Sequence, residues 1–169
     1  GRVQPGSTVA VVGCGGIGLN IVQGARLAGA RQIIAVDKFP RKEADARIFG
    51  ATDYVDVNTT DPVEGIKALT GGKGADFCFE AYGSGKTTEQ AYDATKKGGM
   101  CVVVGITSAA DKAAININQL VYAEKTLRGS IYGTTRPRTD LLTLIDMHRA
   151  GQLKLDELVT ARYPLSGIN

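Results

Sequence analysis

The chain has 169 residues, of which 43% are hydrophobic and 22% charged, as expected for one soluble globular domain. A net charge of +3 with scattered lysines and arginines excludes the basic patch of a nucleic-acid-binding protein. No apolar run approaches the roughly 20 residues that span a bilayer, so a membrane protein is excluded as well. The 22 glycines are about twice the usual share of ~7%, and they gather at the ends of apolar runs, where tight turns need them.

Apolar, β-branched segments alternate along the chain with segments of helical spacing. The predicted strands span residues 8–13, 32–36, 54–57, 75–79, 100–104 and 125–132. The predicted helices span residues 16–28, 40–49, 62–69, 86–96 and 140–150. Asp61 followed by Pro62 predicts the N-cap and the first residue of the third helix. Leu141, Leu144, Ile145 and His148 share one face of the last helix, where we expect His148 to be half-buried.

The strands are continuously apolar rather than alternating, as in Val9–Val12 and Cys101–Val104. Such runs are typical of parallel strands covered on both faces by helices. The pattern therefore predicts an α/β Rossmann fold, a doubly wound parallel sheet of six strands in the order 3-2-1-4-5-6 with helices on both faces. We expect residues 1–169 to form a single domain. The chain begins without Met and its last residues form no predicted closing element, so we expect it to be a piece of a larger protein.

The segment Gly13-Cys14-Gly15-Gly16-Ile17-Gly18 is a G-x-G-x-x-G motif. The motif is weak alone, but here it follows a buried strand and opens a helix, which is the placement of a dinucleotide-binding loop. Gly13 permits the tight turn, Gly15 lets a diphosphate approach the backbone, and Gly18 lets the helix lie close to the strand. The free N–H groups and positive dipole end of the helix then attract the phosphates.

Asp37 ends the second predicted strand, 19 positions after Gly18, close to the spacing of about 20 expected for a ribose-binding acid. A carboxylate there accepts hydrogen bonds from the adenosine ribose and repels a 2′-phosphate, which favours NAD over NADP. The alternative is a strand-end acid that caps the next turn. Lys38, Arg41 and Lys42 follow as a small basic cluster, which could contact the ribose, tolerate NADP or form a solvated face.

Two further motifs are interpreted as coincidences. Gly83-Ser84-Gly85-Lys86-Thr87 resembles a P-loop, but that motif needs glycine where Glu80 stands, and a carboxylate would repel phosphate. Tyr92 and Lys96 match the Y-x-x-x-K pair of short-chain dehydrogenases, but the glycine loop has a different spacing, so we expect the pair on a solvated helix surface.

The sequence offers no catalytic machinery and no metal site of its own. It has one histidine, His148, and no C-x-x-C pair, whereas a zinc site needs three or four converging ligands. No nucleophile-elbow motif is present either. Cys14, Cys78 and Cys101 are far apart and lie in or beside apolar runs, so we expect buried reduced thiols and a cytoplasmic protein.

The landmarks, taken in order, resemble the coenzyme domain of medium-chain, zinc-dependent alcohol dehydrogenases over nearly the whole chain. The matching segments are 3–11, 29–30, 50–52, 74–80, 98–99, 102–106, 128–133 and 158–160. By this resemblance, Gly15, Gly16 and Ile17 line the pyrophosphate, and Asp37 and Lys42 hold the adenosine ribose.

The resemblance also implies contacts at the other end of the coenzyme. Ala81 and Tyr82 contact the coenzyme, Gly105 and Ile106 lie beside the nicotinamide, and backbone groups near Ile106, Ser130 and Tyr132 hold its carboxamide. Residues 127–132 form the edge of a homodimer, and pairing of an apolar edge strand is expected on physical grounds as well.

In the family a separate catalytic domain supplies the zinc ligands and the proton relay, and nothing in this chain replaces them. The resemblance therefore implies that the chain binds NAD(H) for an alcohol dehydrogenase acting on an alcohol and its aldehyde or ketone, but oxidises no alcohol by itself. One alternative is the domain of a zinc-free, NADPH-dependent quinone or enoyl reductase, which clear preference for NADPH would favour. The other is an NAD-sensing regulatory module, which flanking sequence without zinc ligands would favour.

Overall fold

The computed structural model of the chain describes residues 2–168, which fall into two compact units. The first unit ends at Thr134, and the second begins at Thr135. Every residue predicted to contact a cofactor belongs to the first unit.

The first unit is built on a six-stranded parallel sheet with the order β3-β2-β1-β4-β5-β6. Its strands are β1 (Thr8–Val12), β2 (Gln32–Asp37), β3 (Asp53–Asp56), β4 (Ala75–Glu80), β5 (Thr95–Val103) and β6 (Thr126–Gly129). The strand order reverses between β1 and β4, which is where doubly wound sheets bind their ligands. The predicted fold class and strand order are confirmed.

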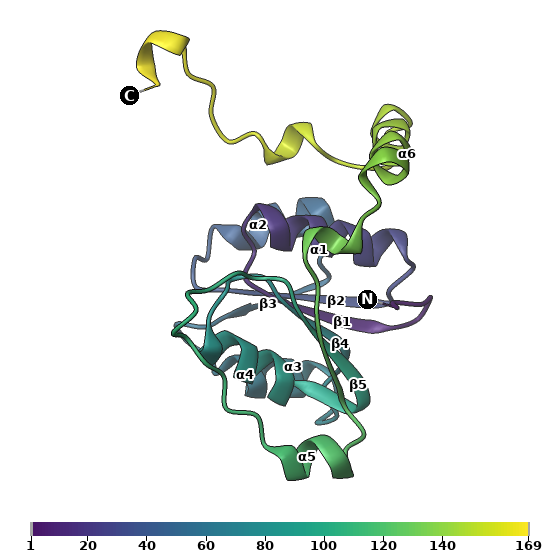
Figure 1. The fold of residues 1–169 in the computed structure, drawn as a ribbon, viewed down its shortest axis with the longest axis vertical. Coiled ribbons are helices and arrows are strands. Elements are labelled where there is room, and N and C mark those ends of the chain that lie inside the picture. Colours follow the sequence, from purple (N-terminus) through teal and green to yellow (C-terminus); the bar gives the residue numbers. More distant parts are fainter. Residues whose placement is uncertain (1, 169) are drawn as a thin grey trace. The chain divides into compact units, whose positions relative to one another are not determined.

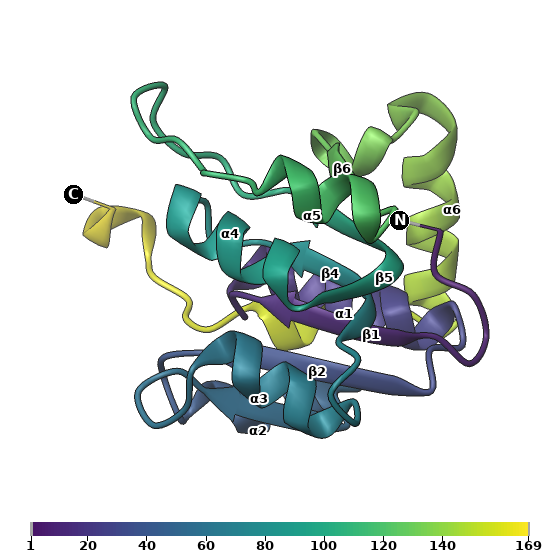
Figure 2. The same ribbon diagram turned by 90° about the horizontal axis from the view of Figure 1, so that it is seen from below.

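Helices cover both faces of this sheet (Figure 1). Helices α1 (Gly16–Leu27) and α2 (Lys42–Phe49) pack on one face, and α3 (Pro62–Leu69) and α4 (Gly85–Asp93) pack on the other, as the second view also shows (Figure 2). Both faces of the central strands are therefore covered by helices, and Val9, Ala10 and Val11 are fully buried. This double cover explains why β1 and β2 are apolar at consecutive positions.

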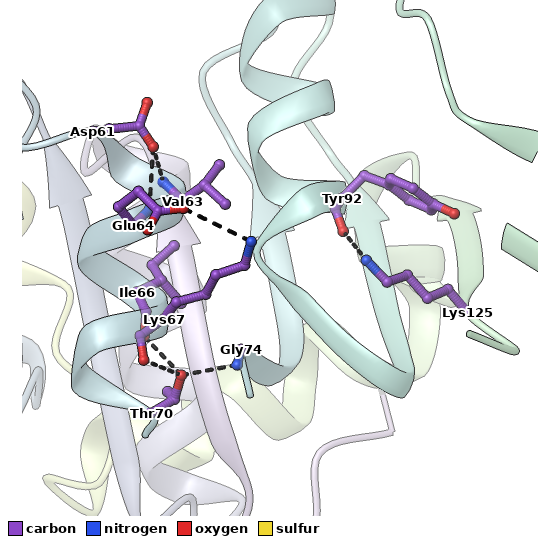
Figure 3. A network of polar contacts seen from close by, with 9 residues as sticks. All are labelled: Asp61, Val63, Glu64, Ile66, Lys67, Thr70, Gly74, Tyr92 and Lys125. Carbon is purple, nitrogen blue, oxygen red and sulfur yellow. Dashed lines mark hydrogen bonds and ion pairs between the residues drawn. The ribbon is translucent and has the colours of Figure 1, made fainter. Parts of the chain in front are cut away.

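Both ends of α3 are closed by side chains (Figure 3). The Asp61 carboxylate accepts hydrogen bonds from the N–H groups of Val63 (2.9 Å) and Glu64 (3.1 Å), and Pro62 occupies the first helical position. At the other end the Thr70 hydroxyl bonds to the Ile66 carbonyl at 2.8 Å. The predicted start of this helix at the Asp-Pro pair is confirmed.

The predicted helix over residues 86–96 is confirmed as far as Asp93 and is wrong for its last three residues. Helix α4 ends at Asp93, and β5 begins at Thr95, because Thr95 pairs with Ala75 of β4 before the register shifts. Tyr92 is buried rather than solvated, and the Lys96 ammonium forms an ion pair with the Asp76 carboxylate. The two residues therefore do not form a pair on an exposed helix surface.

A short helix that the sequence pattern did not reveal, α5 (Ile117–Tyr122), precedes the sixth strand. Lys125 follows it, and its buried ammonium donates to the Tyr92 carbonyl at 2.9 Å and lies 4.6 Å from the centre of the Tyr92 ring (Figure 3). Burial lowers the pKa of Lys125. The predicted strand 125–132 is too long, since β6 ends at Gly129 and Tyr132 adopts a positive φ of 52° in a 3-10 turn.

The second unit consists of α6 (Pro137–Arg149) and two 3-10 turns, Asp156–Leu158 and Leu165–Gly167. Helix α6 begins before the predicted start at residue 140, because Pro137 occupies a first-turn position that needs no N–H donor. His148 is half-buried, as predicted, with Nδ1 3.0 Å from the Leu153 carbonyl.

The three cysteines, Cys14, Cys78 and Cys101, are buried and free, as predicted. Burial raises the pKa of each thiol to about 12. Among residues 2–168, none of the helices has the length and apolar character required to cross a bilayer.

Candidate functional site

The turn between β1 and α1 and the first turn of α1 each contain a glycine that the fold itself requires. Gly13 adopts a φ of +94°, which side chains rarely tolerate, and its N–H donates to the Val36 carbonyl at 2.8 Å. A Cβ on Gly18 would lie 1.8 Å from the Gly13 carbonyl oxygen. Gly18 is therefore glycine because α1 lies directly against the turn, as the motif predicts.

Gly15 and Gly16 have no such reason to be glycine. Gly15 has an ordinary φ of −75°, and a Cβ on either residue would meet no atom of the chain within 4 Å. Both residues are exposed at the first turn of α1. Side chains at these two positions would fill the space above the backbone. Because both residues are glycine, that space stays open as a cradle in which a ligand can lie directly on the backbone.

The same turn presents unused hydrogen-bond donors. No side chain caps α1, and within residues 2–168 the N–H groups of Gly15, Gly16 and Ile17 have no acceptor. Helix N-termini leave such donors free and carry a partial positive charge, so they bind anions and phosphate groups in particular. The arrangement fits the diphosphate of a dinucleotide.

Asp37 ends β2 directly beside this turn. Its Oδ2 accepts a hydrogen bond from the Cys14 N–H at 2.8 Å, and its Oδ1 accepts one from the Phe39 N–H at 3.0 Å. The bond from Cys14 connects the carboxylate to the glycine turn. The bond from Phe39 caps the turn after β2, which is the role that the alternative interpretation of Asp37 predicts. Each oxygen retains a further lone pair, so the carboxylate can also accept from a ribose.

Tyr54 supports this end of the site, and the sequence analysis did not single it out. Its hydroxyl donates to the Phe39 carbonyl at 2.9 Å, which fixes the segment after Asp37. Burial raises the pKa of Tyr54, and the nearby Asp37 charge adds to the effect. Tyr54 pairs in register with Ala35 of β2, a relation that only the folded sheet reveals.

The basic residues after Asp37 do not act as one cluster. The Lys42 ammonium forms an ion pair with Asp45 at 3.1 Å, one turn along α2. Lys38 and Arg41 instead lie over the exposed ring of Phe39, at 5.0 and 5.4 Å from its centre.

Ala81 and Tyr82 follow β4 and lie against the glycine turn, since a Cβ on Gly13 would lie 3.0 Å from the Tyr82 nitrogen. Glu80 holds this segment from within. Its buried Oε1 accepts hydrogen bonds from the N–H of Tyr82 (2.9 Å), the N–H of Gly83 (2.7 Å) and the hydroxyl of Thr87 (2.8 Å). The sequence signal for this role is an acid at the end of an otherwise apolar run.

A cavity of about 680 Å³ opens beside the first turn of α1 and is mainly apolar. It joins five of the predicted site residues, which are Gly16, Ile17, Ile106, Ser130 and Tyr132. Outside its lining lie the others, Gly13, Gly15, Gly18, Asp37, Lys38, Lys42, Ala81, Tyr82 and Gly105. The glycine turn therefore stands between two regions, an acidic one at Asp37 and an apolar one at the cavity.

Metal-binding side chains do not gather in the part of the chain that the structure describes. No three His, Cys, Asp or Glu residues among 2–168 lie close enough to hold an ion. The described residues thus do not fit a zinc site.

The chain matches the family model described as zinc-binding dehydrogenase over residues 16–148. Alcohol dehydrogenase-like 6 of Arabidopsis thaliana is 37% identical over 170 residues, which cover 99% of this chain and 44% of the plant protein. The chain thus spans less than half the length of this relative.

Solved structures show the same likeness. An alcohol dehydrogenase zinc-binding domain protein from Burkholderia ambifaria superposes with a TM-score of 0.93 at 37% identity, over 98% of this chain and 44% of that one. A zinc-binding dehydrogenase from Sinorhizobium meliloti 1021, bound to NADP, superposes with a TM-score of 0.86 at 31% identity, over 94% of this chain and 46% of that one.

Proposed function

Because this chain belongs to the zinc-binding dehydrogenase family, we propose that it is the NAD-binding domain of an alcohol-dehydrogenase-type oxidoreductase. One observation carries the proposal: Gly15 and Gly16 leave an open cradle over free N–H groups that the fold itself does not need. The diphosphate of the cofactor lies on that cradle.

The two regions beside the glycine turn bind the two halves of the dinucleotide. Asp37 binds the adenosine ribose, and Lys38 and Lys42, which follow it along the chain, are further contacts to that half. Gly105 and the apolar wall formed by Ile17 and Ile106 receive the nicotinamide, with backbone groups near Ser130 and Tyr132 for its carboxamide. Bound NAD supplies the carbon that exchanges hydride with an alcohol or carbonyl carbon.

In the whole enzyme, this chain orients the nicotinamide, and the remaining part supplies the groups that act on the alcohol, aldehyde or ketone. We expect the 169-residue chain to bind the cofactor without oxidising alcohols. Zinc belongs to the remaining part, because the described residues bring no ligand set together.

Preference for NAD over NADP depends on Asp37, because its charge repels a 2′-phosphate. In a calorimetric titration we expect NADH to bind at least about tenfold more tightly than NADPH. Asp37→Ala loses charge-assisted bonds worth about 1.5–3 kcal/mol each, so NADH affinity should fall about 10- to 100-fold and the preference should disappear.

A matched control is Asp53→Ala, which removes a carboxylate from the opposite end of the neighbouring strand β3 and should leave NADH affinity unchanged. Absence of NADH binding to the wild-type chain would contradict the proposal. Unchanged NADH affinity in Asp37→Ala would contradict only the assignment of Asp37 to the ribose. A preference for NADPH would reverse the choice of cofactor, in line with the NADP bound to the Sinorhizobium relative.

We also propose that the chain forms a homodimer through the edge strand β6 and the residues that follow it, within 127–132. Among the residues that the structure describes, strand β6 pairs with β5 alone. Its residues are exposed, and Leu127 is 42% exposed, which leaves an apolar edge open to a second copy. Sedimentation equilibrium should show a dimer that Leu127→Lys dissociates. Val57→Lys, beside the opposite edge strand β3, should remain dimeric; a monomer at every wild-type concentration would contradict this interface.

A further inference from the structure

The loop of residues 104–116, which joins β5 to α5, lies against the N-terminal turn of α4. Asp111 Oδ2 accepts hydrogen bonds from the Gly85 N–H at 2.9 Å and from the Thr107 hydroxyl at 2.7 Å. Farther along, Glu89 Oε1 accepts a hydrogen bond from the Ala114 N–H at 2.6 Å. Two carboxylates, one from the loop and one from the helix, thus attach the loop at two points.

Three glycines allow the loop to lie directly on the backbone of its neighbours. A Cβ on Gly83 would lie 2.6 Å from the Ile106 carbonyl oxygen, and one on Gly85 would lie 2.1 Å from the Lys112 carbonyl oxygen. A Cβ on Gly105 would lie 2.3 Å from the Gly83 nitrogen. The glycines of the motif that resembles a P-loop therefore serve close backbone packing instead of phosphate binding.

The attachment matters because the loop begins at the cofactor site. Gly105 and Ile106 are its second and third residues, and Ile106 lines the apolar cavity. Ile106 is 78% exposed, so its own packing does little to hold it in place. Its backbone is held by packing against Gly83, by the hydrogen bonds of Val104 and Gly105 to the Glu80 carbonyl, and by the attachment at Asp111 farther along the loop.

We infer that Asp111 is a positioning residue that keeps Gly105 and Ile106 in place for the nicotinamide half of the cofactor. The inference rests on the proposed function, which assigns those two residues to the nicotinamide. The adenosine half lies at Asp37, on a different strand, and does not depend on the loop.

The charge of Asp111 suits this role. The Gly85 N–H, at the start of α4, lowers the pKa of Asp111, and the Thr107 hydroxyl adds to the effect. The carboxylate is therefore ionised at neutral pH and faces the positive end of the helix dipole. Asparagine at this position retains an acceptor oxygen for the Gly85 N–H, whereas alanine retains none.

The test compares NADH with ADP-ribose, which lacks the nicotinamide. In Asp111→Ala we expect the Kd for NADH to rise about tenfold, as for the loss of one hydrogen bond to a charged group, while the Kd for ADP-ribose stays within about twofold. Asp111→Asn should recover most of the NADH affinity. A purely structural role would change both ligands alike.

Asp61→Ala is the matched control, because it removes a carboxylate that caps α3 rather than one that holds the loop. It should lower stability through loss of the helix cap and leave the ratio of the two Kd values unchanged. Glu89→Ala tests the second attachment and serves as the second variant if Asp111→Ala does not fold.

Trypsin gives a readout that does not involve the cofactor. Lys112 is the one lysine or arginine in the loop, so cleavage after it requires the loop to leave α4. We expect faster cleavage at Lys112 in Asp111→Ala than in the wild-type chain or in Asp61→Ala.

Equal weakening of NADH and ADP-ribose in Asp111→Ala would overturn the inference, and so would unchanged NADH affinity. An unchanged rate of cleavage at Lys112 would overturn the attachment itself. If the wild-type chain binds neither ligand, the proposed function fails and this inference fails with it. If the wild-type chain binds both ligands and Asp111→Ala gives one of the results above, only the role of the loop is overturned.

Discussion

Replacing Gly18 by alanine is expected to lower the free energy of unfolding by about 3 kcal/mol. The new Cβ would lie 1.8 Å from the Gly13 carbonyl oxygen, so α1 would have to move away from β1. The penalty opposes the usual gain of about 1 kcal/mol for replacing glycine inside a helix by alanine. Urea denaturation followed by circular dichroism measures the difference.

Gly24→Ala is the matched control for this effect. Gly24 lies in the same helix, is exposed and has no atom within 4 Å of the position that a Cβ would take. The substitution should raise the free energy of unfolding by about 0.5–1 kcal/mol. If both variants were equally stable, close contact between α1 and the turn would not be the reason for Gly18.

Replacing Gly15 by alanine is expected to affect binding and leave the fold unchanged. A Cβ at this position meets nothing in the chain, so the free energy of unfolding should stay within about 0.5 kcal/mol of the wild-type value. The same Cβ would occupy the space above the free N–H groups of α1. Loss of about 2 kcal/mol of charge-assisted hydrogen bonding should raise the Kd for NADH about 30-fold in calorimetry.

Adenosine is the control ligand that tests whether the effect of Gly15→Ala depends on the diphosphate. Because it has no phosphate, it should bind the wild-type chain and Gly15→Ala with the same low affinity. If Gly15→Ala bound NADH with wild-type affinity, the cradle would not be part of the cofactor site. If the variant were unfolded, Gly15 would be required by the fold.

Much of the fold could be predicted because local signals agreed with the tertiary structure. The continuous apolar run of β1, the glycine turn and the Asp61–Pro62 pair each determine their own neighbourhood, and the structure contains all three. The errors occur where distant contacts decide. Thr95 belongs to β5 because it pairs with Ala75, and β6 stops at Gly129 although apolar residues continue to Tyr132.

The candidate site follows the same rule. The glycine turn and Asp37 could be located from spacing along the chain, and the structure brings them within hydrogen-bond distance through the Cys14 N–H. Tyr54 could not be assigned a role in advance, because its partners lie 15 or more positions away, at Asp37 and Phe39. Glu80 bonds within its own turn, and its signal, an acid at the end of an apolar run, does not say which groups it binds. Asp111 gave no signal at all, since its bond to Gly85 joins residues 26 positions apart.

The buried thiols make the fold sensitive to base. In the folded chain Cys14, Cys78 and Cys101 keep their protons up to about pH 12, whereas exposed thiols lose theirs near pH 8.5–9. As the pH rises through this interval, the unfolded chain releases three protons that the folded chain retains, so alkalinity shifts the equilibrium towards unfolding. Handling the protein near neutrality preserves the full contribution of these three side chains.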